Sequence, residues 1–174
     1  MTDAAQPTSP SPATPEDLFR RLAELGIETK THSHPPLMTV EDSKRLRGDL
    51  PGGHCKNLFL KDRKGRMWLV VTLEDRRIDI KGLEARLGAA RLSFGSPDRL
   101  LATLGVSPGA VTPFALINDR ERKVTAVLDQ AMLSHDPLNY HPLTNERTTA
   151  IRPQDLIRFI EACGHRPEIL NLDA

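Results

Sequence analysis

The run CKNLFL at residues 55–60 contains the first side chains that could do chemistry, Lys56 and Asn57. If the run forms a strand, its side chains alternate between two faces, which puts Lys56 with the two leucines and Asn57 on the opposite face. Burying an ammonium group is costly unless it is paired, so a lysine on an apolar face is unusual and indicates a functional charge. The competing interpretation, which alternation alone favours, is a lysine at the start of a strand whose ammonium group reaches solvent.

The loop SPGAVTPF at residues 107–114 is the second candidate. Its glycine, Gly109, permits an unusual backbone turn, and Pro113 fixes the exit of the loop. A loop held in this way can direct several backbone N–H groups at a carbonyl oxygen, a ribose hydroxyl or a developing oxyanion. The same pattern is typical of a plain connection between a helix and a strand, and the sequence alone favours that interpretation.

The segment HPLTN at residues 141–145 is the third candidate, because it gathers an imidazole, a hydroxyl and an amide near Thr148 and Thr149. Side chains of these types can position a polar ligand by donating and accepting hydrogen bonds. Proline and asparagine are also common turn residues, so a simple turn explains the segment equally well.

Other catalytic and metal-binding patterns are weaker. His32 and His34 share one face of a predicted strand, but no third ligand follows at a clear spacing, so no metal site is expected. Cys55 directly follows His54, and adjacent strand residues point to opposite faces, so the two are not expected to act as nucleophile and base. The sequence contains no HExxH, CxxC, Walker A or GxGxxG pattern, and no cofactor is expected.

The elements that must position these candidates follow from apolar periodicity and from capping residues. Helices are predicted over residues 15–25, 40–47, 80–87, 97–104 and 153–163. Strands are predicted over 27–33, in a hairpin of 54–62 with 66–73, in a pair of 113–118 with 123–128, and at 147–151. Several neighbouring strands are joined by short turns, which favours an α/β fold with a mixed β-sheet and packed helices over a doubly wound parallel sheet.

Length and composition indicate a single folded domain. The chain has 174 residues, of which 39% are hydrophobic and 27% are charged, as in an ordinary globular protein. Residues 1–13 are rich in proline, serine, threonine and alanine, and we expect them to form a disordered tail before a domain at 14–174.

The net charge of +1 excludes a general nucleic-acid polycation and leaves only a local basic patch for any phosphate contact. A solvated surface is the simpler interpretation for most of the basic residues that could form such a patch. These residues are Lys44, Arg45, Arg47, Lys61, Arg63, Lys64 and Arg66.

The sequence predicts a cytoplasmic protein without a membrane segment. Its first residues contain neither the basic region nor the apolar region of a secretory signal. The longest apolar run, around residues 67–71, is too short to cross a bilayer. The two cysteines, Cys55 and Cys163, are far apart in the sequence and are expected to be reduced.

Together, the three candidate segments resemble the YbaK-like editing-domain family, and within it the free-standing prolyl-tRNA editing proteins that deacylate Ala-tRNA(Pro). The resemblance covers about residues 15–165 and depends on three motifs in the right order. It implies an α/β fold with a mixed sheet, and it assigns the essential catalytic lysine of the family to Lys56. The substrate-binding residues that it implies are Asn57, Gly109, Ala110, Val111, Thr112, Pro113 and His141.

The resemblance also implies a reaction, the hydrolysis of the ester that joins a wrong amino acid to the terminal adenosine of tRNA(Pro), with Ala-tRNA(Pro) as the expected substrate. An aminoacyl ester is already activated, so a positioned water and an oxyanion site would suffice. We expect the substrate's own ribose hydroxyl to activate that water. The expected partners are the acceptor end of tRNA(Pro) and prolyl-tRNA synthetase. Two alternatives stay open: a non-catalytic module that binds tRNA ends, and an editing enzyme for another mischarged tRNA such as Cys-tRNA(Pro).

Size exclusion is the expected basis of specificity, because a small pocket admits alanine and rejects proline. Discrimination in the other direction is weak, since one methylene contributes only about 1–3 kcal/mol of binding. Candidates for lining this pocket are Met38, Thr39, Val40 and Phe59, and an ordinary core role explains each of them as well.

Overall fold

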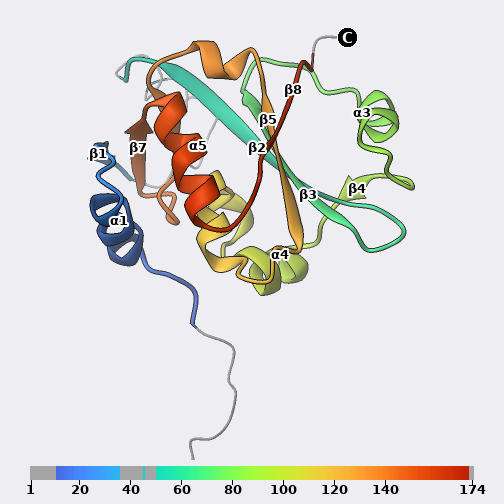
Figure 1. Cartoon of the computed structure of the whole chain (residues 1–174), viewed down its shortest axis with the longest axis horizontal. Helices are drawn as coiled ribbons and strands as arrows, with labels where there is room; N and C mark the ends of the chain where they lie inside the picture. Colours follow the sequence, from blue (N-terminus) through green and yellow to red (C-terminus); the bar gives the residue numbers. More distant parts are fainter. Residues whose placement is uncertain (1–10, 36–44, 46–49, 173–174) are drawn as a thin grey trace, which may run out of the picture.

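The α-helices begin where the sequence supplies prolines and capping residues. The computed structural model describes residues 11–35, 45 and 50–172. Its α-helices, labelled as in Figure 1, are α1 Pro15–Glu24, α3 Ile80–Leu87, α4 Pro97–Leu104 and α5 Pro153–Ala162. Three of these four begin at a proline, whose fixed φ suits the first helical turn and whose missing N–H would have no helical partner there. They confirm four predicted helices, and the prediction for 40–47 lies outside the described residues apart from Arg45.

The strands form one mixed sheet. They are β1 Lys30–Ser33, β2 Gly53–Lys61, β3 Met67–Leu73, β4 Ser93–Phe94, β5 Val124–Asp129, β6 Leu138–Tyr140, β7 Arg147–Ile151 and β8 Glu168–Leu170. Their order is β1-β7-β6-β2-β3-β5-β8, with β4 paired to β2. The pairs β2–β6, β3–β5 and β5–β8 are parallel, and the other pairs are antiparallel. The predicted α/β fold with a mixed sheet and packed helices is confirmed.

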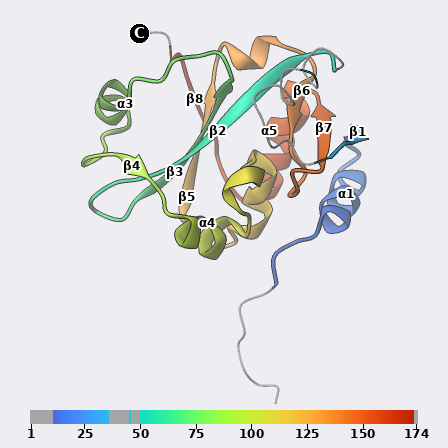
Figure 2. The ribbon, with the colours of Figure 1, turned by 180° about the vertical axis from the view of Figure 1, so that it is seen from behind.

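Two apolar clusters lie on opposite faces of this sheet. The larger cluster defines face A and joins the sheet to α1, α4, α5 and a 3-10 helix, η3 (Pro113–Asn118). The smaller cluster defines face B and joins β2, β3 and β5 to α3. Alternation along β3 identifies the two faces, since Leu69 belongs to the first cluster and Val70 to the second. Figures 1 and 2 show α5 lying across the sheet, with α1 and α3 at opposite ends of the molecule.

The segment 113–118 is the 3-10 helix η3, and the strand predicted there is wrong. Pro113 has no N–H to donate to a strand ladder. Thr112 caps the helix, because its hydroxyl accepts a hydrogen bond from the N–H of Phe114 at 3.2 Å. The strand predicted at 123–128 is confirmed as β5, but it pairs in parallel with β3 and β8 instead of forming a hairpin.

The shortest elements were not predicted from the sequence. Strands β4, β6 and β8 contain two or three residues each, too few for an alternation to be recognised. The same holds for two further 3-10 helices, η2 (Pro108–Ala110) and η4 (Met132–Ser134). Their positions are decided by the longer strands and helices on which they pack.

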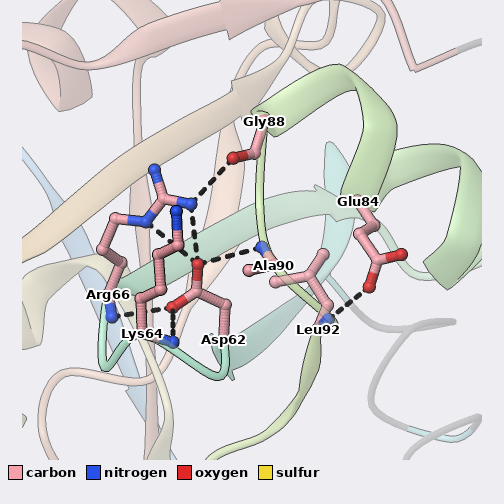
Figure 3. Close-up of polar contacts among 7 residues, drawn as sticks. All are labelled: Asp62, Lys64, Arg66, Glu84, Gly88, Ala90 and Leu92. Atoms are coloured by element: carbon pink, nitrogen blue, oxygen red, sulfur yellow. Dashed lines mark hydrogen bonds and ion pairs between the residues drawn. The ribbon is translucent and has the colours of Figure 1, made fainter.

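One buried carboxylate, Asp62, fixes the turn of the β2–β3 hairpin to the segment after α3 (Figure 3). It accepts hydrogen bonds from the backbone N–H groups of Arg66 and Ala90 at 2.9 and 3.1 Å. The Arg66 guanidinium binds the same carboxylate, donates to the carbonyl of Gly88 at 2.8 Å and lies over the ring of Trp68. Arg66 therefore has a structural role, which accounts for this member of the predicted basic patch without a nucleic-acid contact.

The pKa of Asp62 is lowered by this arrangement. Burial alone would raise the pKa, but the backbone hydrogen bonds from Ala90 and Arg66, together with the Arg66 guanidinium, lower it from 3.8 to about 2. The folded protein therefore binds this proton more weakly than the unfolded chain does. The stability that the carboxylate contributes is complete above about pH 4 and is lost as the pH falls through about 2.

We predict that Asp62→Asn lowers the melting temperature at pH 7 by several degrees, because an amide oxygen cannot replace a carboxylate that binds both backbone donors and a guanidinium. The difference between wild type and variant should shrink as the pH falls from about 4 to about 2. Thermal unfolding followed by circular dichroism at a series of pH values measures both effects. Asp75→Asn, at an exposed position after β3, is the control, and equal effects of the two substitutions at pH 7 would contradict the anchoring role.

Candidate functional site

The candidate site lies at a gap in the sheet beside β2. Strand β6 pairs with only the first two residues of β2, and β4 pairs with only the last two. Within the described part of the chain, no strand pairs with this edge of β2 between Cys55 and Phe59. The opposite edge is paired with β3 throughout this stretch. The Lys56–Asn57 pair therefore lies beside a strand edge that none of the described strands covers.

Backbone groups of the odd-numbered residues of β2 point toward this gap. The N–H of Gly53 donates to the carbonyl of Pro137 at 2.8 Å, on the side of β6. The carbonyl of Phe59 accepts from the N–H of Gly95 at 2.9 Å, on the side of β4. Because backbone N–H and C=O groups repeat their direction every second residue of a strand, those of Asn57 also point to this side. The gap thus offers a main-chain donor and a main-chain acceptor to a ligand.

The side chains of Lys56 and Asn57 belong to opposite faces of β2. Lys56 pairs with Thr72 of β3. Both lie on face B, which also carries Leu58 and Leu60. Asn57 lies on face A. The alternation predicted from the sequence is confirmed, and the two residues can approach a ligand in the gap from its two sides.

Lys56 is half-buried, and its ammonium group makes no hydrogen bond or ion pair with the described residues. An acid on the same face, Asp129, already has other partners. Its carboxylate accepts from the Thr72 hydroxyl at 2.7 Å and from the Arg76 guanidinium at 2.6 Å. The ammonium group of Lys56 therefore has no counter-ion among these residues, which suits it to bind a phosphate or an oxygen on which negative charge develops.

The side chain of Asn57 carries an unsatisfied polar atom. Its Oδ1 is buried and accepts no hydrogen bond from the described residues. A buried acceptor without a donor destabilises a protein by about 1–3 kcal/mol, and such atoms are rare in folded proteins. A ligand that donates an N–H or O–H to this oxygen would remove the cost, so the arrangement suits a ligand-binding residue.

The loop of residues 109–113 ends in a buried anchor, because Pro113 and the next three residues of η3 are all buried. The prediction that Gly109 makes an unusual backbone turn is wrong, since its φ does not lie in the left-handed region. A side chain at this position would meet its neighbour at an ordinary contact distance. A Cβ atom built on it would lie 3.4 Å from Nδ2 of Asn145, so the loop and the segment that follows β6 lie side by side.

The ring of His141 has one nitrogen bound and one nitrogen open. Its Nδ1 donates a hydrogen bond to the carbonyl of Arg147 at 3.0 Å, because a carbonyl can only accept. The neutral ring then carries a lone pair on Nε2, for which the described residues provide no partner. Burial, and to a smaller extent the neighbouring ring of His34, lower the pKa of His141 below its usual 6.5. His141 is therefore a hydrogen-bond acceptor at neutral pH.

The parallel register of β6 with β2, continued beyond the ladder, leads to His141 and Lys56. The last pair in this ladder joins Asn139 to His54. Two residues beyond this pair are His141, after β6, and Lys56, on β2, and both lie on face B. The loop at Gly109 thus lies beside the turn that follows His141, and strand register puts His141 on the same face as Lys56.

The neighbouring cysteine is not equipped for catalysis. Burial raises the pKa of the Cys55 thiol to about 12, although a hydrogen bond with Tyr140 partly opposes the rise. His54 lies on the opposite face, where its Nε2 is 2.9 Å from the carbonyl of Leu50. Cys55 and Cys163 are both free thiols. Because they lie on opposite faces of β2, Cys55 and His54 do not contact each other as nucleophile and base.

The predicted pocket-lining residues and one histidine complete the comparison between sequence and structure. The pocket candidates Met38, Thr39 and Val40 lie outside the described residues. Phe59 is a core residue of face A, and its ring fills the space in which Gly95 has no side chain. Sequence reasoning missed His34, which it considered only as one half of a metal pair with His32. In the structure its ring lies beside that of His141.

The chain is similar to proteins of one family. Residues 34–159 match the family model of the aminoacyl-tRNA editing domain. Prolyl-tRNA synthetase associated domain-containing protein 1 of Danio rerio is 41% identical over 99% of this chain and 97% of its own length. The prolyl-tRNA editing protein ProX of Acetoanaerobium sticklandii is 35% identical over 89% of this chain and 95% of its own. The crystal structure of a candidate trans-editing enzyme for prolyl tRNA synthetase has the same fold, with a TM-score of 0.71 and 18% identity over 93% of this chain and 98% of that one.

We predict that Asn57→Leu has a melting temperature equal to or above that of wild type, because it removes a buried acceptor that has no donor. The matched control is Asn139→Leu, since the amide of Asn139 donates to the carbonyls of Pro51 and Gly53 at 3.0 and 3.1 Å. The control should lower the melting temperature by on the order of 5 °C. Scanning calorimetry measures both, and a loss in Asn57→Leu as large as in the control would show that the Asn57 amide is satisfied within the fold.

Proposed function

Because this chain belongs to the aminoacyl-tRNA editing domain family, we propose that it is a trans-acting deacylase that hydrolyses the ester of mischarged tRNA(Pro), above all Ala-tRNA(Pro). The similarity to the prolyl-tRNA editing protein ProX supports this proposal, since it extends over 95% of that protein. We assign the editing domain to residues 14–174. The family match bears out the expectation of an editing enzyme, and the choice of alanine is the finer part of the proposal.

The proposal is supported by the open polar groups on the three segments that carry the family motifs. Lys56 brings an ammonium group that has no counter-ion among the described residues, and the loop at Gly109 lies against Asn145. His141 brings an open acceptor nitrogen. Hydrolysis of an activated ester requires groups of these kinds, because the catalyst has to hold the ester, stabilise the developing oxyanion and position a water molecule.

Each group has a role in the proposed reaction. Lys56 supplies positive charge near the ester carbonyl or the terminal ribose-phosphate. The backbone of residues 109–113 holds the ester end, and Asn57 and His141 bind the ligand by hydrogen bonds. The substrate's own ribose hydroxyl activates the attacking water. A protein nucleophile is unnecessary because the ester is already reactive, and the buried thiol of Cys55 is unsuited to that role.

The proposed partner is the acceptor end of tRNA(Pro), and prolyl-tRNA synthetase is the proposed source of the mischarged substrate in the cytoplasm. Selection among amino acids is by size, with proline excluded and alanine admitted. Within the described ranges, none of the helices combines the length and the apolar character needed to cross a membrane.

Lys56→Ala is expected to lower kcat for Ala-tRNA(Pro) by about 100-fold or more, since the loss of one group that stabilises an oxyanion has effects of this size. The melting temperature should stay within a degree or two of wild type, because the ammonium group binds none of the described residues. Release of labelled alanine from tRNA(Pro) measures the rate. Lys64→Ala, which removes an exposed lysine from the hairpin turn, is the control, and wild-type turnover by Lys56→Ala would refute the assigned role.

A panel of tRNA(Pro) charged with alanine, cysteine, serine or proline tests the substrate. Loss of label from Ala-tRNA(Pro) alone supports the proposal in full. Loss from Cys-tRNA(Pro) alone would identify a different editing enzyme of the same family. Binding of the charged tRNA without loss of any label would identify a non-catalytic module.

A further inference from the structure

His34, the residue after β1, is held by three hydrogen bonds. Its backbone N–H donates to the carbonyl of Glu146 at 2.8 Å. Its ring Nδ1 lies 2.8 Å from the carbonyl of Pro35, and its Nε2 lies 2.8 Å from the hydroxyl of Thr148. Because a carbonyl can only accept, Nδ1 carries the proton and Nε2 accepts from the hydroxyl. These bonds hold the ring in one orientation, and in the neutral ring they select a single tautomer.

The same bonds decide between two roles for the residue. Both ring nitrogens of His34 are occupied, so neither is available to coordinate a metal together with His32. Thr148 is buried, and its hydroxyl is used on this ring although the backbone register places Thr148 opposite His32. A half-buried ring that is fixed at both nitrogens can restrict the rotation of a neighbouring side chain.

That neighbour is His141. The two ring centroids are 6.2 Å apart and the ring planes are inclined by 55°, within the range of direct aromatic contact. His141 is itself held at one nitrogen, by the carbonyl of Arg147. The contact with His34 restricts rotation of the ring about this single hydrogen bond, so it decides where the open Nε2 of His141 points.

Strand register extends this row of side chains to Lys56. The ladder of β6 with β7 includes the pair Tyr140 with Thr149. One residue beyond, Thr148 lies across from His141 on face B. Lys56 is on the same face. In the strand order β1, β7, β6, β2, face B therefore carries His34, Thr148, His141 and Lys56.

We propose that His34 is a positioning residue for the deacylation, an inference that rests on the proposed function. His34 keeps His141 neutral and aimed so that its Nε2 accepts a hydrogen bond from the ribose hydroxyl of the terminal adenosine. That bond turns the hydroxyl proton toward the ring and leaves a lone pair of the hydroxyl oxygen for the attacking water. His34 does not touch the reacting atoms.

The charges around His141 favour the neutral form of its ring. Among the described residues, the titratable group in contact with His141 is His34, across the ring contact. The side chain of Arg147 turns away to Glu16, at 3.0 Å, and Glu146 is exposed. A positive charge beside His141 lowers the pKa of its ring and so favours the neutral form, which accepts a hydrogen bond.

The test uses two matched pairs of variants of the full chain. His34→Ala removes the ring that contacts His141, and His32→Ala removes an exposed ring from the same face of β1, two residues away. Thr148→Val removes the hydroxyl from which His34 accepts, and Thr148→Ser retains it. Melting temperatures of the four variants show that each one folds.

Positioning predicts that His34→Ala and Thr148→Val each lower kcat for Ala-tRNA(Pro) by on the order of 10-fold, with KM changed by less than about threefold. The double variant should be no slower than His34→Ala, because both substitutions release the same ring. His32→Ala and Thr148→Ser should match wild type. Equal kcat values for His34→Ala and His32→Ala, or a wild-type kcat for Thr148→Val, would overturn the proposal.

A second readout, titration of the His141 ring by NMR, does not depend on turnover. Burial and then His34 lower the pKa of His141, so His34→Gln should raise it and should move the acid limb of kcat/KM to higher pH. An unchanged titration would overturn the proposal even if deacylation is slowed. If wild type deacylates no charged tRNA(Pro) while the titration shifts, the proposed function fails and the pairing of the two rings stands.

Discussion

The fold depends on how β2 satisfies its backbone hydrogen-bonding groups. Every N–H and C=O inside a sheet needs a partner, and β6 and β4 are both too short to cover the second edge of β2. Between Cys55 and Phe59 the described strands leave that edge open. The loop at Gly109 and the turn after His141 lie side by side. The site is therefore a property of short strands, because the polar groups that they leave unpaired are those that a ligand can use.

Regular elements could be predicted because their signals are local. Prolines and capping residues marked the helices, and the alternation in residues 54–73 marked the β2–β3 hairpin and the faces of Lys56 and Asn57. The segment 113–118 has the apolar content of a strand, but the proline at its start and the cap at Thr112 favour a 3-10 helix. Strands of two or three residues have no period of their own, so only their partners in the fold decide where they pair.

The site was predictable in part, and for a different reason. Alternation made Lys56 an unusual residue, but it gave no means of connecting it with a loop more than fifty positions away. Three motifs that resemble one family supplied that connection. His34 lacked such help, since its partner Thr148 is 114 residues away and its use of both ring nitrogens is visible only in three dimensions. For Gly109 the expected unusual backbone turn was wrong, because its φ lies outside the left-handed region.

The two pairs of residues that join β6 to β2 also divide the sheet mechanically. On one side of this joint are β1, β7 and β6, and on the other are β2, β3, β5 and β8. A ladder this short resists relative twisting of the two halves only weakly, so the packing on face A has to supply the stiffness. His141 belongs to one half and Lys56 to the other. The width of the proposed site is therefore coupled to the twist between the two half-sheets. A tRNA acceptor end bound as proposed would contact both halves and restrict this twist.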